Sequence, residues 1–224
     1  MLGSFAKLGE LLFPSRCVGC KRYNGLLCQD CRQALPLLNG VCGRCALPRG
    51  MGECRGCGKL APSLASLRAV CSYDGVARSA VHVLKYRGGR NVSRLLGELM
   101  RQHIAQRPLR VELVIPVPLS KRRRRERGYN QAELLAREIV HAVGASLAFD
   151  ALDRRERPAQ QGLDAAARLR NLEGAISVGK PIDGKTVLLV DDVATTGATL
   201  SACADALKAA GAEEVRALVF ARDL

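Results

Sequence analysis

Aromatic residues are scarce in this chain of 224 residues: Trp is absent, and aromatic side chains make up only 4%. Proteins that bind nucleic acid by stacking bases on exposed rings need more of them. The composition therefore argues against an RRM or a typical single-strand-binding OB fold. The three histidines all come at His82 or later, and none lies in a recognisable site. We expect them to be ordinary helix residues.

Long apolar runs are missing as well. No stretch approaches the roughly 20 residues that a membrane-spanning helix needs. Residues 1–13 are interrupted by Lys7 and Glu10 and are followed by no small-residue cleavage site, so they do not resemble a signal peptide. We therefore expect a soluble, cytoplasmic protein whose first residues form a short amphipathic helix.

Acidic residues are in deficit, because 35 Lys and Arg face 21 Asp and Glu, which gives a formal net charge of +14. The excess is uneven. Residues 61–180 carry 22 basic and 11 acidic side chains, whereas residues 181–224 carry 4 basic and 7 acidic ones. A positive protein favours an anionic partner, but charge does not choose among nucleic acid, a phosphorylated metabolite and a membrane surface.

Cysteine, in contrast, is abundant, and eight of the ten cysteines form four CxxC pairs. These pairs are Cys17/Cys20, Cys28/Cys31, Cys42/Cys45 and Cys54/Cys57. Reduced CxxC pairs are typical of zinc knuckles, and two knuckles complete a tetrahedral four-sulfur site. We predict a small double zinc-ribbon module over residues 1–60 with two Zn²⁺ ions. An iron–sulfur cluster or a redox dithiol is the alternative.

The pairing of the knuckles is open from the sequence. The simplest arrangement is sequential, with the first two pairs in one site and the last two in the other, but an interleaved cross-brace uses the same residues. The metal is expected to be structural because the module has few large apolar residues and no histidine. Cys71 and Cys203 stand alone in apolar stretches, where we expect them to be buried.

The remainder, residues 61–224, has the pattern of an α/β domain. We expect a linker over 61–67, followed by alternating strands and helices. Strands are expected at 69–73, 113–117, 186–190 and 215–220, and helices around 76–84, 92–104, 131–143 and 198–210. Such alternation predicts a parallel sheet with helices on both faces, whose ligands bind beyond the carboxyl ends of the strands.

One segment carries the chemistry. An apolar run at 187–190 leads into Asp191 and Asp192, then into a turn, and a helix follows at once. The turn contains Thr195, Thr196, Gly197 and Thr199. Backbone N–H groups, hydroxyls and the positive helix end suit a phosphate there, and paired carboxylates suit vicinal hydroxyls or a phosphate-bound metal. A Walker loop is excluded because its Gly-Lys-Ser/Thr ending is absent.

Residues 187–199 resemble the signature of type I phosphoribosyltransferases: apolar residues, two acids, then x-x-T-T-G-x-T. By this resemblance, Asp191 and Asp192 hold the ribose hydroxyls of phosphoribosyl pyrophosphate (PRPP), and the turn binds its 5′-phosphate. The residues assigned to the phosphate are Ala194, Thr195, Thr196, Gly197, Ala198 and Thr199. The resemblance implies a Rossmann-like parallel sheet for residues 61–224.

Four CxxC pairs ahead of such a motif resemble the ComF family, whose members are linked to DNA uptake in competent bacteria. The resemblance spans about residues 12–222. Residues 84–88 resemble the family's pyrophosphate-side loop, which assigns Lys85, Tyr86, Arg87 and Gly88 to PRPP. Residues 116–119 and 127–131, Arg124, and the spaced Gln161, Arg168 and Asn171 also match the family pattern.

The basic run 121–127 can be interpreted in three ways. As a mobile active-site loop, it would help to neutralise the departing pyrophosphate, with Mg²⁺ bridging the phosphates. As a nucleic-acid contact, it would hold the backbone of single-stranded DNA through Arg122, Arg123 and Arg125. As a solvated charge run, it would do neither. The resemblance makes the expected catalytic residues Asp191, Asp192, Lys85, Arg87, Arg124 and Arg127.

Three functions remain open. The first is an enzyme, a PRPP-dependent phosphoribosyltransferase whose acceptor the sequence does not name. The second is a competence factor that binds single-stranded DNA and uses its PRPP site as a sensor. The third is an adaptor whose zinc module docks a partner, such as a helicase-like ATPase of the uptake machinery. The sequence leaves the oligomeric state open as well.

Overall fold

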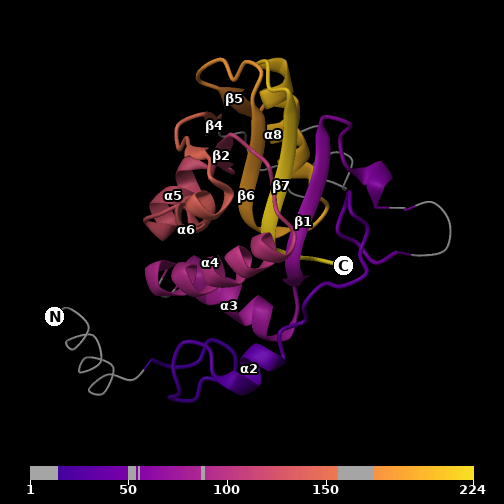
Figure 1. The fold of residues 1–224 in the computed structure, drawn as a ribbon. Coiled ribbons are helices and arrows are strands. Elements are labelled where there is room, and N and C mark those ends of the chain that lie inside the picture. Colours follow the sequence, from indigo (N-terminus) through magenta and orange to yellow (C-terminus); the bar gives the residue numbers. More distant parts are fainter. Residues whose placement is uncertain (1–14, 50–53, 55, 87–88, 156–173) are drawn as a thin grey trace, which may run out of the picture.

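A five-stranded parallel sheet lies at the centre of the computed structural model (Figure 1). The structure describes residues 15–49, 54, 56–86, 89–155 and 174–224. The strand order is β1 (Leu64–Ser72), β7 (Glu214–Arg222), β6 (Thr186–Ala194), β2 (Leu113–Pro116) and β3 (Ser146–Leu147). Every pairing in this sheet is parallel, so the carboxyl ends of the strands lie along one edge.

Helices cover both faces of the sheet, as the alternation predicts. One face carries α3 (Gly75–Tyr86), α4 (Gly89–Gln106) and α6 (Gln131–Val143). Their apolar stripes share a core with Leu188 and Phe220. The other face carries α8 (Ala198–Ala209), in one core with Leu189 and Val219. Neighbouring residues of a strand point to opposite faces, which explains why Leu188 and Leu189 belong to different cores.

A second, antiparallel pair of strands stands apart from the main sheet. It consists of β4 (Leu152–Arg154) and β5 (Ile176–Val178). Leu152 and Ile176 are buried in the same core as the apolar residues of α8. The chain between these strands includes Gln161, Arg168 and Asn171, which lie outside the described residues.

The cysteine-rich region precedes the sheet and contains two short helices, α2 (Gln29–Gln33) and η1 (Cys57–Lys59). Residues 36–44, between these helices, run along the outer edge of β1. Leu38 N–H donates to the Val70 carbonyl at 3.1 Å, and Leu67 N–H donates to the Arg44 carbonyl at 2.7 Å. The region therefore packs on the sheet, and a domain boundary between residues 60 and 61 stays a prediction.

The structure corrects the expected linker at 61–67. β1 begins at Leu64, and both Leu64 and Leu67 are completely buried. The pattern misleads because Pro62, Ser63 and Ser66 are typical loop residues, whereas the strand is held by its pairing with β7, a contact far away in the sequence. β6 is also longer than expected, and it includes Asp191 and Asp192.

The basic run is a helix, α5 (Lys121–Arg127), and not a loop. Local caps account for it. Ser120 accepts a hydrogen bond from the Arg123 N–H, and Gly128 ends the helix with a φ of 76°. Among the described residues, no helix is long and apolar enough to cross a membrane.

Candidate functional site

The eight paired cysteines form two compact clusters. Cys17, Cys20, Cys28 and Cys31 make the first, and Cys42, Cys45, Cys54 and Cys57 make the second. The sulfur atoms of each cluster lie within 4.8 Å of one another. The sequential arrangement of knuckles is therefore confirmed over the interleaved one.

The sulfur spacing tests whether zinc fits. A tetrahedral site with Zn–S bonds of about 2.3 Å places its sulfurs about 3.8 Å apart. The Sγ–Sγ distance is 3.7 Å between Cys17 and Cys28, and 3.4 Å between Cys42 and Cys57. These separations are far longer than a disulfide bond and close to those of a four-sulfur metal site. Both clusters can therefore hold zinc with little movement.

The surroundings of the clusters favour thiolates at some of these cysteines. Burial would raise the pKa of Cys17, but N–H groups of Cys28, Cys20 and Gly19 outweigh it and lower the pKa to about 6. Cys42 behaves alike: burial opposes the N–H groups of Arg44 and Cys45, which lower its pKa to about 6. Backbone donors aimed at sulfur are the physical mark of a metal knuckle. Such preformed thiolates release fewer protons when a metal binds.

The two remaining cysteines are buried in the sheet domain, as expected. Burial raises the pKa of Cys71 to about 12, and its thiol donates to the Phe220 carbonyl at 3.3 Å. Cys203 lies on α8, and burial raises its pKa still further. Neither thiol is a nucleophile at neutral pH, because the reactive form is the thiolate.

The turn between β6 and α8 forms a small concave site at the carboxyl edge of the sheet. A cavity of about 60 Å³ is lined by Asp191 and by residues 193–200. Gly197 adopts a left-handed φ of 84° directly before α8, and Thr196 Oγ1 accepts a hydrogen bond from the Ala198 N–H at 3.2 Å. The first N–H groups of α8 have no partner within the helix, so this cavity suits a phosphate.

The acidic pair lies at the mouth of this cavity. Asp191 is half-buried, and Asp192 is 3% exposed. Each carboxylate accepts a hydrogen bond from the following N–H, which fixes its orientation: Asp191 Oδ1 from Asp192 at 2.8 Å, and Asp192 Oδ1 from Val193 at 3.0 Å. Burial, and next the charge of Asp192, raises the pKa of Asp191 well above its usual range.

Lys85 reaches the acidic pair from the end of α3. Its Nζ lies 2.9 Å from Asp192 Oδ2, and only 21% of the lysine side chain is exposed. Asp192 Oδ2 has no hydrogen-bond partner of standard geometry among the described groups. An atom that is buried, ion-paired and still able to accept a hydrogen bond is what a ligand hydroxyl requires.

Residues 127–131 hold the end of α3 in place. Tyr129 donates to the Leu84 carbonyl, and its ring fills the space beside Gly89, where an added Cβ would lie 2.5 Å from the ring. Arg127 stacks over the exposed Tyr86 ring at 5.3 Å. The structure thus places Arg127 against Tyr86, the residue that follows Lys85, and the assignment of these residues to PRPP stays a prediction. Arg87 and Gly88 lie outside the described residues.

The arginines of α5 divide into two groups. Arg124 makes a two-pronged ion pair with Glu133, with N–O distances of 2.9 and 3.3 Å. This contact ties Arg124 to α6, so its expected role on pyrophosphate would require it to leave that partner. The outer residues Arg122, Arg123 and Arg125 are exposed, and Arg122 pairs with Glu126 at 3.4 Å.

Two further arginines belong to this region but carry no local sequence signal. Arg154 on β4 is half-buried; burial and then the charge of Arg123 lower its pKa, whereas the charge of Asp191 raises it. Arg222 at the end of β7 is 1% exposed and donates to the Ala194 carbonyl at 2.9 Å. The pairing of β7 with β6 brings Arg222 to the acidic edge, whereas Arg154 comes from the separate β4–β5 pair, so the pattern around them could not reveal their place.

Comparisons with known proteins show what this chain is similar to. Residues 125–224 match the phosphoribosyl transferase domain family. The DNA utilization protein YhgH of Salmonella typhi is 30% identical, over 96% of this chain and 100% of that protein. Competence protein F of Haemophilus influenzae is 30% identical, over 94% of this chain and 98% of that protein. A hypoxanthine phosphoribosyltransferase structure from Staphylococcus aureus aligns with a TM-score of 0.38 and 14% identity, over 57% of this chain and 61% of that one.

Proposed function

The chain belongs to the ComF family, with competence protein F and the DNA utilization protein YhgH, and we propose that it binds Mg-PRPP and serves DNA uptake. In this proposal the 5′-phosphate occupies the turn formed by residues 194–199. The ribose hydroxyls bind Asp191 and Asp192, and the pyrophosphate lies towards Lys85 and Arg127.

The buried carboxylate of Asp192, held by Lys85 beside the cavity, is the observation that carries this proposal. Its Oδ2 contacts Lys85 Nζ at 2.9 Å but makes no hydrogen bond of standard geometry among the described groups, so it can still accept one from a ligand. It lies beside a cavity suited to a phosphate, and vicinal ribose hydroxyls are donors that can reach a carboxylate pair at the edge of that cavity. Lys85 would then turn from Asp192 towards the pyrophosphate.

The same arrangement suits a phosphoribosyl transfer. In the proposed step, the bond from C1′ to the pyrophosphate oxygen breaks, its electron pair leaves with pyrophosphate, and the acceptor nucleophile bonds to C1′. Lys85 and Arg127 would stabilise the charge that develops on the leaving group. Mg²⁺ bound to the phosphates would share that work. A screen of nucleophiles for pyrophosphate release from PRPP would identify an acceptor.

Calorimetry with Mg-PRPP tests the site. The double variant Asp191→Asn with Asp192→Asn should lose binding, because neutral amides cannot replace two carboxylates that accept hydroxyl protons. Asp150→Asn is the matched control, since that carboxylate is 79% exposed and pairs with the equally exposed Lys180. If the double variant binds Mg-PRPP like the wild type, the ribose assignment is wrong.

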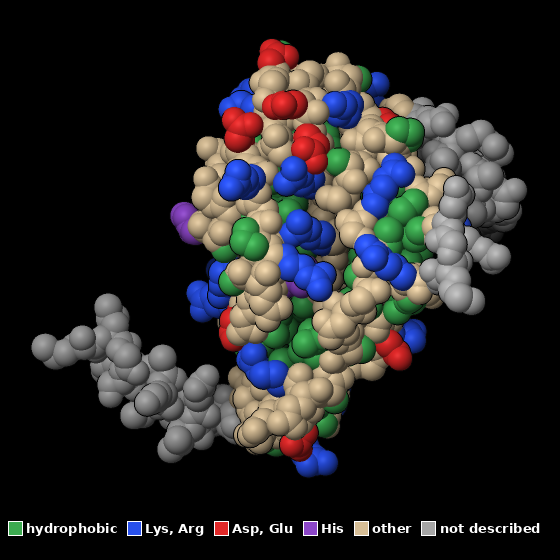
Figure 2. Space-filling view, turned by 45° about the vertical axis from the view of Figure 1, so that its right-hand side comes forward, with side chains coloured by type: hydrophobic (Ala, Val, Ile, Leu, Met, Phe, Trp, Pro, Cys, Tyr) green, Lys and Arg blue, Asp and Glu red, His purple; other side chains and the backbone are tan. Residues whose placement is uncertain are grey.

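A second basic surface favours nucleic acid as an additional partner. Figure 2 shows a face of the molecule on which Lys and Arg side chains gather. Arg68 donates to the Arg107 carbonyl at 2.7 Å, and Arg216 donates to the Arg110 carbonyl at 3.3 Å. Burial lowers the pKa of Arg68, and the charges of Arg216 and Arg107 lower it further. Clustered like charges of this kind favour a polyanion.

We propose that this surface holds the backbone of single-stranded DNA. Acidic partners occur on both basic surfaces: Arg216 pairs with Glu214 at 2.7 and 3.0 Å, and on α5 Glu126 and Glu133 pair with two arginines.

Two triple variants separate the two basic surfaces. One changes Arg68, Arg107 and Arg110 to Gln, and the other changes Arg122, Arg123 and Arg125 to Gln. Each lost phosphate contact should reduce the slope of log affinity against log salt by about 0.7, so three contacts reduce it by about 2. Fluorescence anisotropy with a single-stranded oligonucleotide measures that slope. If only the second variant reduces that slope, the DNA contact lies on α5 instead.

A further inference from the structure

The second cysteine cluster lies directly against the turn that binds phosphate in the proposed function. Leu60, the residue after η1, is 4% exposed and packs on Gly197. A Cβ at position 197 would come within 2.5 Å of Leu60 Cδ2, so the two residues are in close contact. Since Cys57 begins η1, only two residues separate a metal ligand from the residue that supports the turn.

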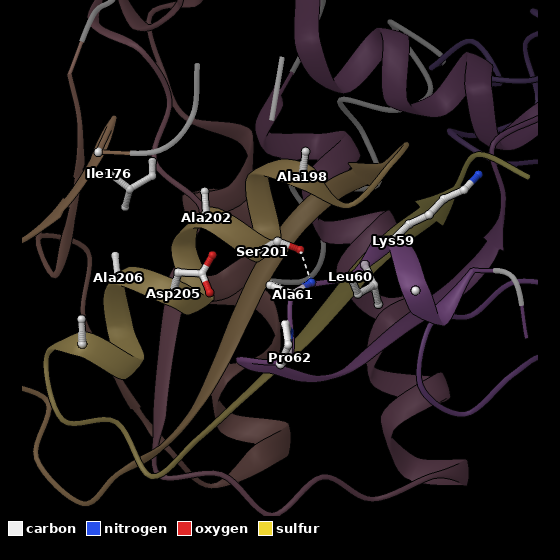
Figure 3. Close-up of a pocket in the computed structure, with 13 residues that line it drawn as sticks. Lys59, Leu60, Ala61, Pro62, Ile176, Ala198, Ser201, Ala202, Asp205 and Ala206 are labelled. Atoms are coloured by element: carbon white, nitrogen blue, oxygen red, sulfur yellow. Dashed lines mark hydrogen bonds between the residues drawn. The ribbon is translucent and has the colours of Figure 1, made fainter. Parts of the chain in front are cut away.

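The next residues of the same segment hold α8. Ala61 N–H donates to Ser201 Oγ at 3.0 Å, and Ser63 Oγ donates to Asp205 Oδ1 at 2.6 Å. Figure 3 shows Leu60 and Ala61 facing the first turns of α8, with Ser201 and Asp205 on the helix. The segment that follows the second cluster therefore positions both the turn and the helix N-terminus behind it.

Arg222 forms a second connection between the cluster and the turn. Its Nη1 donates to the Ala194 carbonyl, which also accepts from the Asp223 N–H at 2.9 Å. Burial lowers the pKa of Arg222, whereas the charges of Cys45 and Asp223 raise it. Asp223, the next residue, is one negative neighbour of this buried guanidinium, and the cluster that contains Cys45 is the other. With Zn²⁺ bound, four thiolates would leave that cluster a net charge of −2, which would help to balance the charge that holds Ala194.

The first cluster packs elsewhere. Its buried cysteines form a small core with Leu27 and Val76, the second of which lies in the first turn of α3. Gly19 of its first knuckle lies against Cys31 and Val76. This cluster is also built from two CxxC pairs, with seven residues between the pairs where the second cluster has eight, so it is a natural internal control.

We propose that metal at the second cluster regulates the phosphate turn, so that its loss weakens binding of phosphate ligands, whereas loss of metal from the first cluster does not. The inference rests on the proposed function and deepens it by naming a regulator of that site. Arg222 is a positioning residue in this arrangement, because it acts through the Ala194 carbonyl.

Matched variants test the asymmetry. Cys42→Ser with Cys45→Ser and Cys17→Ser with Cys20→Ser should each lose one of two zinc ions by elemental analysis. Hydrogen exchange of residues 194–201 should quicken about tenfold in the second-cluster variant only, a typical size for coupling between sites. Calorimetric affinity for Mg-PRPP should fall by the same factor there. Equal exchange of this segment in both variants would overturn the proposal.

Linkage provides a test with the unmodified protein. If zinc at the second cluster strengthens ligand binding about tenfold, the ligand must strengthen zinc binding equally. Mg-PRPP should then protect one of the two zinc ions from a competing chelator. Arg222→Met should weaken zinc at one site, and Arg222→Lys should restore part of it. Protection of both ions, or of neither in a protein that binds Mg-PRPP, contradicts the coupling.

The exchange experiment separates this inference from the proposed function. It needs no ligand, so an asymmetric effect on residues 194–201 supports the coupling even when Mg-PRPP fails to bind. In that case the proposed function fails and the regulation of the turn stands.

Discussion

The ion pair between Lys85 and Asp192 allows a quantitative prediction. Lys85→Met removes the cation and keeps most of the side-chain volume. At the observed N–O distance of 2.9 Å, an effective dielectric constant of about 20 gives a gross attraction of about 6 kcal/mol. Because Asp192 is left buried with an unpaired charge, we expect the free energy of unfolding to fall by about 3–5 kcal/mol.

The reverse change should cost less. Asp192→Asn leaves Lys85, whose side chain is 21% exposed and can extend its ammonium to water or towards Asp191. We expect a loss of about 1 kcal/mol, comparable to an ordinary hydrogen bond. The double variant Lys85→Met with Asp192→Asn should then lose less stability than the two single losses added together. The coupling energy, about 2–3 kcal/mol, measures the pair itself.

Urea unfolding at neutral pH measures all three variants against the wild type. Lys180→Met is the matched control, because its ion pair with Asp150 is 3.7 Å long and 79% exposed on both sides, where about 0.5 kcal/mol is the expected limit. Added salt should leave the loss of stability caused by Lys85→Met nearly unchanged, since a buried ion pair is poorly screened. A Lys85→Met loss as small as that of the control would refute the reasoning.

Three more changes have defined outcomes. Asp191→Asn should stabilise the protein by about 1–2 kcal/mol at neutral pH, because the raised pKa of Asp191 means that the stability contributed by its protonated form is present in acid and lost as pH rises through that pKa. The melting temperature of the variant should therefore exceed that of the wild type by more as the pH rises. Parallel melting curves of the two proteins across pH would count against this reasoning. Gly197→Ala should lower the free energy of unfolding in urea by about 1–3 kcal/mol, since φ is 84° and Leu60 lies where the added Cβ would be. An unchanged free energy of unfolding would contradict this close contact. Gly89→Ala should displace the Tyr129 ring and weaken Mg-PRPP binding, and calorimetry with unchanged affinity would separate that ring from the site.

Local patterns account for much of the fold. The run from Thr186 into the turn and helix predicts β6, the phosphate turn and α8, because strand, turn and helix cap are all encoded by neighbouring residues. The bounds expected for α6 are the observed ones, Gln131–Val143, since its apolar stripe is uninterrupted and Asn130 caps its start. The CxxC spacing likewise predicts both clusters.

Distant contacts account for what the sequence could not predict. β1 is a strand over Leu64–Ser72 only because β7 pairs with it. Arg154 belongs to a basic stretch that by itself indicates only a charged surface, and Arg222 has unremarkable neighbours; folding brings the two residues to Asp191 and Ala194. The run 121–127 has no apolar stripe, so the sequence lacks the pattern that predicts an amphipathic helix. Its caps nevertheless suffice to form an exposed helix there.

The chain segment along β1 has a consequence for folding in the cell. β1 is the last strand on its side of the sheet, and an uncovered strand of this kind can pair with another molecule. Residues 36–44 occupy its hydrogen-bonding groups through the contacts of Pro36, Leu38 and Arg44. The covering segment runs from just after the first cysteine cluster into the second, which begins at Cys42, and it is synthesised before the strand it protects. Metal bound at the second cluster would therefore help to hold this cover in place and keep the edge of β1 from pairing with another molecule.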